Sequence, residues 1–163
     1  MCGLTGIIDF RARPEQALVD AMTASLSHRG PDAHAVWLEG PAGLGHRRLS
    51  ILDLNERANQ PMLSADGRHV IVFNGEVYNF RELRAELQAK GARFRTDGDT
   101  EVVLCAFQQL GTACFARLNG MFAIAIWDRE AQELTLARDR FGQKPLYVAR
   151  TESAVLFGSE VKS

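Results

Sequence analysis

Short apolar runs separated by polar and glycine-rich turns recur along this chain, and most have the length of a β-strand. Residues 120–127 are apolar throughout, which is typical of a strand buried on both faces between two layers. The runs predict strands at residues 3–10, 34–39, 42–51, 69–73, 119–127, 132–138, 145–150 and 154–158.

Three further segments carry apolar residues at the spacing of an amphipathic helix. They begin at Pro14, Asn79 and Gly98. In the first segment, Leu18, Met22 and Leu26 fall on one face. The second begins with a sequence that resembles a capping box, and in the third Asp99 is a candidate N-cap.

Asn74-Gly75 ends the predicted strand at residues 69–73, and two interpretations are open. Asn-Gly between apolar runs is the strongest short signal for a β-hairpin. However, a helical pattern follows it, so the strand leads into a helix and the Asn-Gly pair is expected at an exposed strand end. A functional site could be built there.

The order of the elements predicts an α+β fold. Strands and helices do not alternate regularly, which favours antiparallel sheets with helices packed outside them over a doubly wound parallel sheet. With one strand buried on both faces, two sheets are expected to lie face to face. The polar stretch 55–66, which contains Pro61, is expected to be a surface loop.

Size and charge limit the classes of function. The 163 residues fit one domain, and 19 Lys and Arg against 20 Asp and Glu give a net charge of −1. With no basic run, neither a nucleic-acid nor a membrane partner is expected. The start of the chain lacks the features of an export signal, so the cytoplasm is the expected compartment.

Cysteines and histidines do not form a metal motif. The three cysteines are an odd set without a Cys-x-x-Cys pair, and the four histidines lack paired spacing. We therefore expect no metal site. Cys105 sits inside an apolar pattern and is expected to fill the core.

Cys2 is the candidate nucleophile. It becomes the amino-terminal residue once Met1 is removed, which places a thiol and a free α-amino group on the same residue. An α-amino group titrates at about 7.7 to 8.0, so near neutral pH it can accept the thiol proton without a catalytic histidine. A small residue after Met1 is also common in proteins that have no such chemistry, so the other motifs are needed to distinguish a catalytic cysteine from an ordinary one.

Seven motifs occur in an order that resembles the class II glutamine amidotransferases, and in particular the glutaminase half of asparagine synthetase-like proteins. The motifs span nearly the whole chain. They are Cys2-Gly3 with Gly6, His28-Arg29-Gly30-Pro31-Asp32, Gly45-His46-Arg47-Arg48-Leu49-Ser50-Ile51, Asn74-Gly75-Glu76 with Tyr78-Asn79, Asp99-Thr100-Glu101, Gly120-Met121-Phe122-Ala123, and Asp139-Arg140-Phe141-Gly142-Gln143-Lys144-Pro145-Leu146-Tyr147. The resemblance implies the four-layer αββα sandwich of N-terminal-nucleophile hydrolases, two antiparallel sheets flanked by helices.

The resemblance also implies a reaction. Cys2 would attack the side-chain amide of L-glutamine, release ammonia and leave a γ-glutamyl thioester, which water would hydrolyse to glutamate. The side chain of Asn74 and the backbone N–H of Gly75 would stabilise the oxyanion. Losing one such donor typically costs about 10²- to 10³-fold in rate.

Substrate-binding positions follow from the same resemblance. Arg48 would hold the α-carboxylate of glutamine, and Glu76 and Asp99 would hold its α-ammonium. Leu49, Ser50, Ile51 and Leu52 would line the pocket. The motifs at residues 28–32 and 139–147 are expected to be mainly architectural.

Family members pass ammonia to a synthetase domain, which this chain would lack because residues 1–163 correspond to the glutaminase domain alone. No cofactor is expected here, since ATP and magnesium would belong to the synthetase. Two other functions remain open. One is a non-catalytic glutamine-binding or interaction module, and the other is an N-terminal-nucleophile acylase that acts on a different amide.

Overall fold

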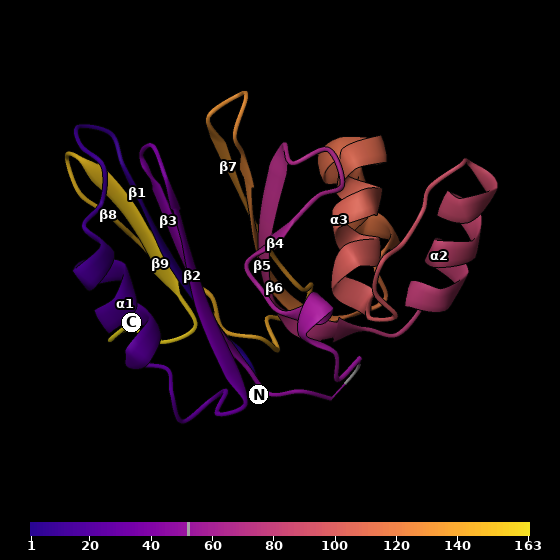
Figure 1. Ribbon diagram of the computed structural model, residues 1–163, viewed down its shortest axis with the longest axis horizontal. Helices are drawn as coiled ribbons and strands as arrows, with labels where there is room; N and C mark the ends of the chain where they lie inside the picture. The colour runs from indigo at the N-terminus through magenta and orange to yellow at the C-terminus, as the bar shows by residue number, and fades with distance from the viewer. Residues whose placement is uncertain (52) are drawn as a thin grey trace.

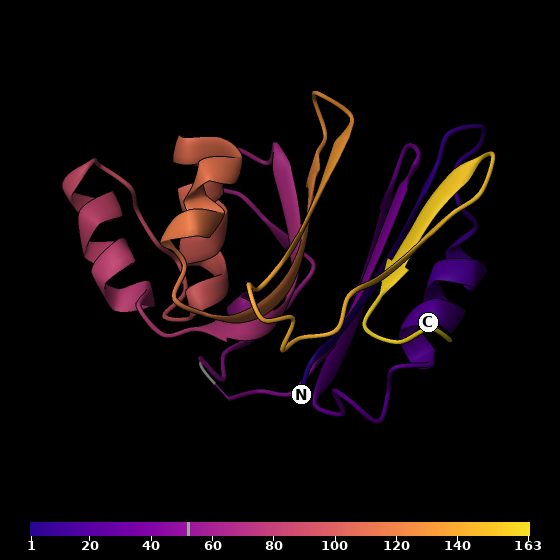
Figure 2. The same ribbon diagram turned by 180° about the vertical axis from the view of Figure 1, so that it is seen from behind.

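Two antiparallel β-sheets form the centre of the protein. The computed structural model describes residues 1–51 and 53–163, and Figures 1 and 2 show the two sheets diverging from the end that carries the N-terminus. In spatial order, the five-stranded sheet consists of β2 (Ala33–Glu39), β3 (Ala42–Arg48), β1 (Gly3–Asp9), β9 (Ala154–Gly158) and β8 (Tyr147–Arg150). The four-stranded sheet consists of β4 (Met62–Leu63), β5 (His69–Val77), β6 (Gly120–Asp128) and β7 (Glu133–Arg138).

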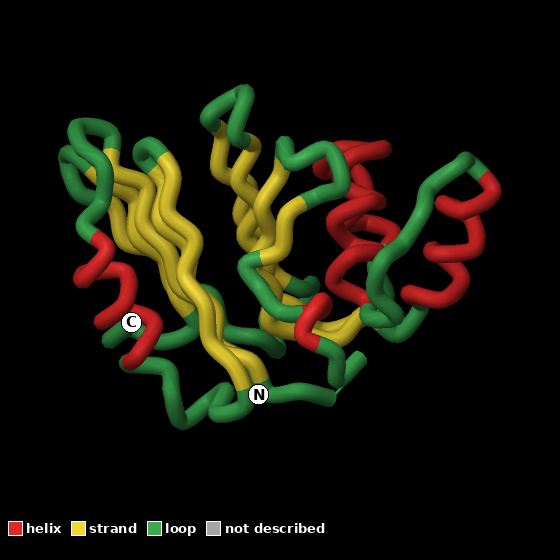
Figure 3. The backbone as a smooth tube through the Cα atoms, in the orientation of Figure 1, coloured by secondary structure: helices red, strands yellow, loops and turns green. Residues whose placement is uncertain are grey.

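Helices cover the outer faces of both sheets, as Figure 3 shows. Helix α1 (Gln16–Ala24) packs on the five-stranded sheet, and α3 (Asp99–Leu110) packs on β5. Helix α2 (Phe80–Ala89) packs beside α3, and the 3₁₀ segments η1 (Glu56–Ala58) and η2 (Gly111–Arg117) complete the elements. The predicted α+β fold, a four-layer αββα sandwich, is confirmed.

Strand β6 shows why the two sheets stack. Its side chains alternate between two hydrophobic clusters. Ile124 and Ile126 point to the cluster under α2 and α3, whereas Ala125 and Trp127 point to the cluster between the sheets. The continuous apolar sequence of this strand is therefore required by burial on both faces, as predicted.

The buried face of helix α1 differs from the predicted one. Met22 and Leu26 are buried, as expected, but Leu18 is 44% exposed and Val19 is buried in its place. The helix begins at Gln16, and the buried positions 19, 22, 23 and 26 keep the three- to four-residue spacing. The helical period was correct and its phase was wrong by one residue at the first turn.

Strand β5 continues beyond its predicted end. Asn74 pairs with Ala123 and Gly75 pairs with Phe122, so both residues lie inside the ladder, which runs to Val77. The prediction of an exposed strand end at Asn74-Gly75 is wrong, because β6 begins at Gly120 and offers partners for the whole segment. The prediction that the strand leads into a helix is confirmed.

The predicted caps of α2 and α3 do not form. The Asn79 side chain makes no cap bond; its amide instead bonds the backbone of Arg117 and Asn119 and ties the start of α2 to the start of β6. At α3, Gly98 is the N-cap residue and Asp99 lies in the first turn. Asp99 is thus available for another role.

Segment 55–66 is not simply a surface loop. It contains η1 and β4, and Gln60, Met62 and Ser64 are buried. Strand β3 ends at Arg48 instead of residue 51, and β8 begins at Tyr147 instead of residue 145. The other strand boundaries agree with prediction to within about two residues, as is usual for element ends.

Candidate active site

A pocket opens at the end of the sandwich that carries the N-terminus. Its empty volume is about 680 Å³, and its walls come from the ends of β3 and β5, the start of α3 and the loop before β8. Most of the predicted site residues line it. These are Cys2, Arg48, Leu49, Ile51, Asn74, Gly75, Glu76 and Asp99.

Strand pairing fixes the position of Cys2. Gly3 pairs with Arg47, so Cys2 lies next to Arg48 at the end of the β1–β3 ladder. The Leu49 backbone N–H donates to the Cys2 Sγ at 3.4 Å, and the Arg29 Nε donates to the Cys2 carbonyl oxygen at 3.0 Å. Arg29 is paired in turn with Glu160 at 3.2 Å. The candidate nucleophile therefore sits on a rigid element.

Asn74 carries a hydrogen-bond donor that the protein leaves unused. The residue is 1% exposed, and within the described part of the chain its Nδ2 has no hydrogen-bond partner. A buried donor without an acceptor costs about 1–3 kcal/mol, so its place on the wall of a pocket is informative. The arrangement is complementary to a ligand oxygen.

Glycine is the only residue type that fits at position 75. A Cβ there would lie 2.2 Å from the Met121 carbonyl oxygen and 2.7 Å from the Phe122 Cα, which are backbone atoms of the paired strand. Because a backbone cannot move aside as a flexible side chain can, a larger residue would disrupt the β5–β6 ladder. The glycine keeps the backbone of β5 close to β6 beside the pocket.

Two buried residues that the sequence analysis did not single out hold the strand just before Asn74. The His46 Nε2 donates to the Phe73 carbonyl oxygen at 3.1 Å, and the Phe73 N–H donates to the Gln60 Oε1 at 2.6 Å. Burial lowers the pKa of His46 to about 4, so the imidazole is neutral near pH 7. His46 lay inside a recognised motif, but nothing local marked Gln60, which was assigned to a surface loop.

Asp99 brings a carboxyl group into the pocket from the first turn of α3. Its Oδ2 accepts a hydrogen bond from the Val77 backbone N–H at 2.9 Å, which links the helix to the end of β5. Burial, helped by the nearby charge of Glu76, raises the pKa of Asp99 to about 6, although the hydrogen bond from Val77 lowers it. Such a group favours a cationic ligand that would restore its charge.

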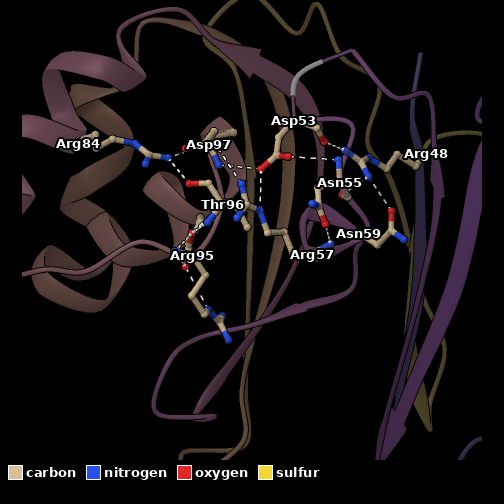
Figure 4. Close-up of polar contacts among 11 residues, drawn as sticks. Arg48, Asp53, Asn55, Arg57, Asn59, Arg84, Arg95, Thr96 and Asp97 are labelled. Atoms are coloured by element: carbon tan, nitrogen blue, oxygen red, sulfur yellow. Dashed lines mark hydrogen bonds and ion pairs between the residues drawn. The ribbon is translucent and has the colours of Figure 1, made fainter.

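Arg48 lines the pocket while holding the loop that follows β3. Its guanidinium donates to the Asn55 carbonyl oxygen at 3.1 Å, to the Asn59 Oδ1 at 2.7 Å and to the Asp53 carbonyl oxygen. Figure 4 shows that Asp53 and Arg57 extend this network to Asp97, in the loop that leads to α3. Two segments of the pocket wall are thereby fastened together.

Lys144 is a pocket residue that the sequence analysis placed in an architectural motif. The architectural role of that motif is borne out by Asp139, whose carboxylate accepts from the backbone N–H groups of Phe122, Phe141, Gln143 and Lys144. The loop so held delivers Lys144 to the wall of the pocket. No local signal distinguished this lysine from a surface residue.

One predicted position does not line the pocket, and another cannot be placed. Ser50 does not line it, and its backbone N–H donates to the Asp32 Oδ2 at 2.7 Å instead. Leu52 lies outside the described residues. Across the described chain, no group of three His, Cys, Asp or Glu residues is arranged to hold a metal ion, and no helix is long and apolar enough to span a membrane.

The fold is shared with a solved structure. The structure aligns with glutamine phosphoribosylpyrophosphate amidotransferase from Bacillus subtilis at a TM-score of 0.80, covering 98% of this chain and 42% of that one with 22% identity. The two proteins therefore share the same fold, the four-layer sandwich of two antiparallel sheets flanked by helices.

Sequence comparison then identifies the family. Residues 1–163 match the model of the glutamine amidotransferase domain, and the chain belongs to that family. Asparagine synthetase [glutamine-hydrolyzing] 3 from Bacillus subtilis is 42% identical over 167 residues, covering 100% of this chain and 27% of the relative. A putative asparagine synthetase from Mycobacterium tuberculosis is 42% identical over 179 residues, covering 99% of this chain and 27% of the relative. The chain thus spans about a quarter of the length of these relatives.

Proposed function

We propose that this chain hydrolyses the side-chain amide of L-glutamine and supplies ammonia to a synthetase. One observation carries the proposal: a cysteine that follows the initiator methionine shares a pocket with the buried, unpaired amide donor of Asn74. A nucleophile and an oxyanion donor in the same pocket are the groups required for acyl transfer.

The first half-reaction begins after Met1 is removed. The free α-amino group of Cys2 accepts the thiol proton, and Sγ attacks the amide carbon of glutamine. Asn74 Nδ2 and the Gly75 N–H donate to the oxyanion of the tetrahedral intermediate. When the C–N bond breaks, the α-ammonium returns its proton to the leaving nitrogen, and ammonia departs from a γ-glutamyl thioester.

The second half-reaction regenerates the enzyme. The α-amino group takes a proton from water, whose oxygen attacks the thioester carbon, and the same two donors stabilise the second oxyanion. The C–S bond then breaks, the thiolate recovers its proton, and glutamate leaves. Atoms balance as glutamine plus water giving glutamate plus ammonia.

Charges in the pocket match the two charged groups of an amino acid. We assign the α-carboxylate of glutamine to Arg48, where it would replace carbonyl acceptors of the 53–59 loop. Asp99 and Glu76 would hold the α-ammonium, and that cation would favour the ionised form of Asp99. Leu49 and Ile51 lie on the same wall.

The names of the relatives suggest the destination of the ammonia. We propose a synthetase domain or subunit, of the asparagine synthetase kind, as the acceptor. ATP and magnesium would act there, and the proposed reaction at Cys2 uses side chains, the backbone N–H of Gly75, the α-amino group and water. Residues 1–163 would then form the glutaminase domain, and the cytoplasm is the proposed compartment.

The test is glutamate release from glutamine, combined with intact mass to confirm loss of Met1. We expect wild-type protein to turn over and Cys2→Ala to lose activity by about 10³-fold or more, since the nucleophile is gone. The matched control is Cys105→Ala, because that cysteine lies in α3 and does not line the pocket. It should retain activity.

Three outcomes would contradict the proposal. Release of glutamate by Cys2→Ala would remove the assigned nucleophile. Binding of glutamine without turnover by correctly processed protein would indicate a binding module. Faster hydrolysis of a different amide would indicate an acylase.

A further inference from the structure

Lys144 is a buried cation without a counter-ion. The residue is 7% exposed and lines the pocket, and no carboxylate of the described residues forms an ion pair with it. Among the described residues, its side chain makes one hydrogen bond, from Nζ to the Met1 Sδ at 3.5 Å. Burying an ammonium group without an anionic partner is unfavourable, so its retention in the pocket calls for an explanation.

The backbone around Lys144 is held firmly. Its N–H donates to the Asp139 Oδ2 at 3.0 Å, and its carbonyl oxygen accepts from the Arg138 Nε at 2.7 Å. Arg138 also bonds the Gly142 carbonyl oxygen, which closes the loop on itself. The loop therefore presents the lysine to the pocket as a built feature.

The contact with Met1 places the ammonium close to the reacting group. Five covalent bonds separate the Met1 Sδ from the Cys2 nitrogen, a span of at most about 6 Å. Removing Met1 takes away the partner of Nζ and creates a free α-amino group in the same region. The 3.5 Å contact and this span together place the lysine ammonium within about 10 Å of the Cys2 nitrogen.

The other charged groups around Cys2 differ from Lys144 in having partners or in lying on other walls of the pocket. Arg29 contacts the Cys2 carbonyl oxygen but is paired with Glu160, and Arg48 is bonded to the 53–59 loop. Glu76 and Asp99 lie on the β5 and α3 walls, where the proposed substrate ammonium would neutralise them. Lys144 is thus the pocket cation for which the described residues provide no hydrogen-bonded oxygen.

We propose that Lys144 sets the protonation state of the amino–thiol pair of processed Cys2, and so keeps the α-amino group available as a base at neutral pH. The proposal rests on the glutaminase function given above. A nearby positive charge disfavours an ammonium and favours a thiolate, so it promotes proton loss from both groups. Since the two groups titrate together, the effect is observed on the pair.

The test is the pH dependence of kcat/KM for glutamate release. In Lys144→Gln we expect the acidic limb of the pH profile of kcat/KM to move to higher pH by about one unit. The kcat/KM of this variant should be about fivefold lower than that of the wild type at pH 7 and should reach the wild-type value near pH 9. Lys144→Arg keeps the charge and should restore the wild-type limb. The control Arg140→Gln removes a charge from an exposed position of the same loop and should change nothing.

Intact mass and a melting curve establish that each variant is processed and folded. An unshifted acidic limb in Lys144→Gln would overturn the inference, as would an equal loss at every pH, which indicates a structural or binding role. Failure of the glutaminase itself would be separate, because processed wild-type protein would then release no glutamate at all.

Discussion

At the scale of single residues, the pocket concentrates polar groups whose burial is unfavourable. Asn74 has an unpaired amide donor, Asp99 is a buried carboxyl group, and Lys144 lacks a counter-ion. Elsewhere, buried carboxylates are well bonded, as Glu101 is by the N–H groups of Arg95 and Thr96. An unpaired donor and an uncompensated cation that line the same pocket are typical of a site that a ligand completes.

Asp99→Asn should make the protein more stable while weakening glutamine binding. Because the pKa of Asp99 is raised from 3.8 to about 6, the folded state holds this proton more tightly than the unfolded state. Wild-type stability therefore falls as pH rises between these values, and the asparagine variant avoids that loss. Its amide oxygen can still accept from the Val77 N–H.

We expect Asp99→Asn to raise the free energy of unfolding, measured by urea denaturation, by about 1–3 kcal/mol at pH 8. Below pH 4 the substitution should change it little. The KM for glutamine should rise at pH 8, because the carboxylate that we propose binds the α-ammonium of glutamine has been removed. Equal stability of the two proteins at pH 8 would show that Asp99 is not destabilised by burial.

At the scale of elements, the loop between β7 and β8 depends on one carboxylate. Asp139 is buried and accepts four backbone N–H groups. Burial by itself would raise the pKa of Asp139, but the N–H groups of Lys144, Gln143 and Phe122 outweigh it and hold that pKa below its usual value. The loop conformation and the position of Lys144 thus share one cause.

Asp139→Asn should loosen this loop. An amide offers one acceptor oxygen, so some buried N–H groups would lose their partner, at an expected cost of about 2–4 kcal/mol at pH 7 by urea denaturation. The stabilisation by Asp139 is present above its ordinary pKa of 3.8 and is lost as pH falls through its lower folded value, so the difference should narrow in acid.

Asp9→Asn is the matched control for that substitution. Asp9 accepts two backbone N–H groups, those of Arg11 and Ala12, in an exposed turn where water can replace a lost bond. Its cost should stay below about 1 kcal/mol. A cost at Asp139 no larger than at Asp9 would contradict the assigned role of the buried carboxylate.

At the scale of the whole molecule, the layer between the sheets joins the two halves of the fold. Phe157 of β9 and Trp127 of β6 come from different sheets and belong to the same hydrophobic cluster. Gly6 makes room for the ring of Phe157, since a Cβ at that glycine would lie 2.3 Å from its Cζ. This core serves the pocket too, because the pocket walls come from both sheets.

Phe157→Ala should open a cavity between the sheets. Phe157 is 2% exposed, and truncation of a buried phenylalanine typically costs about 3–5 kcal/mol in the free energy of unfolding. The matched control is Phe141→Ala, since Phe141 is 83% exposed and should change stability by less than about 0.5 kcal/mol. Similar melting curves for the two variants would contradict the assignment of the inter-sheet core.

The fold class could be predicted because hydrophobic patterns report burial directly. The continuous run in β6 required burial on two faces, and the missing βαβ alternation favoured antiparallel sheets. The path of β5 could not be predicted in the same way. Whether Asn-Gly ends a strand depends on the neighbouring strand, and here β6 supplies partners as far as Val77.

The sequence by itself determined the candidate nucleophile, the family motifs and most of the elements, because these depend on residue identity and on local spacing. Only the tertiary structure decided which groups meet in the pocket and which of them lack partners. Gln60 and Lys144 reach it from segments whose local sequence resembles a surface loop and a structural turn. The burial and the electrostatic environment of a site depend on segments that are distant in the sequence. No local sequence pattern therefore predicts them.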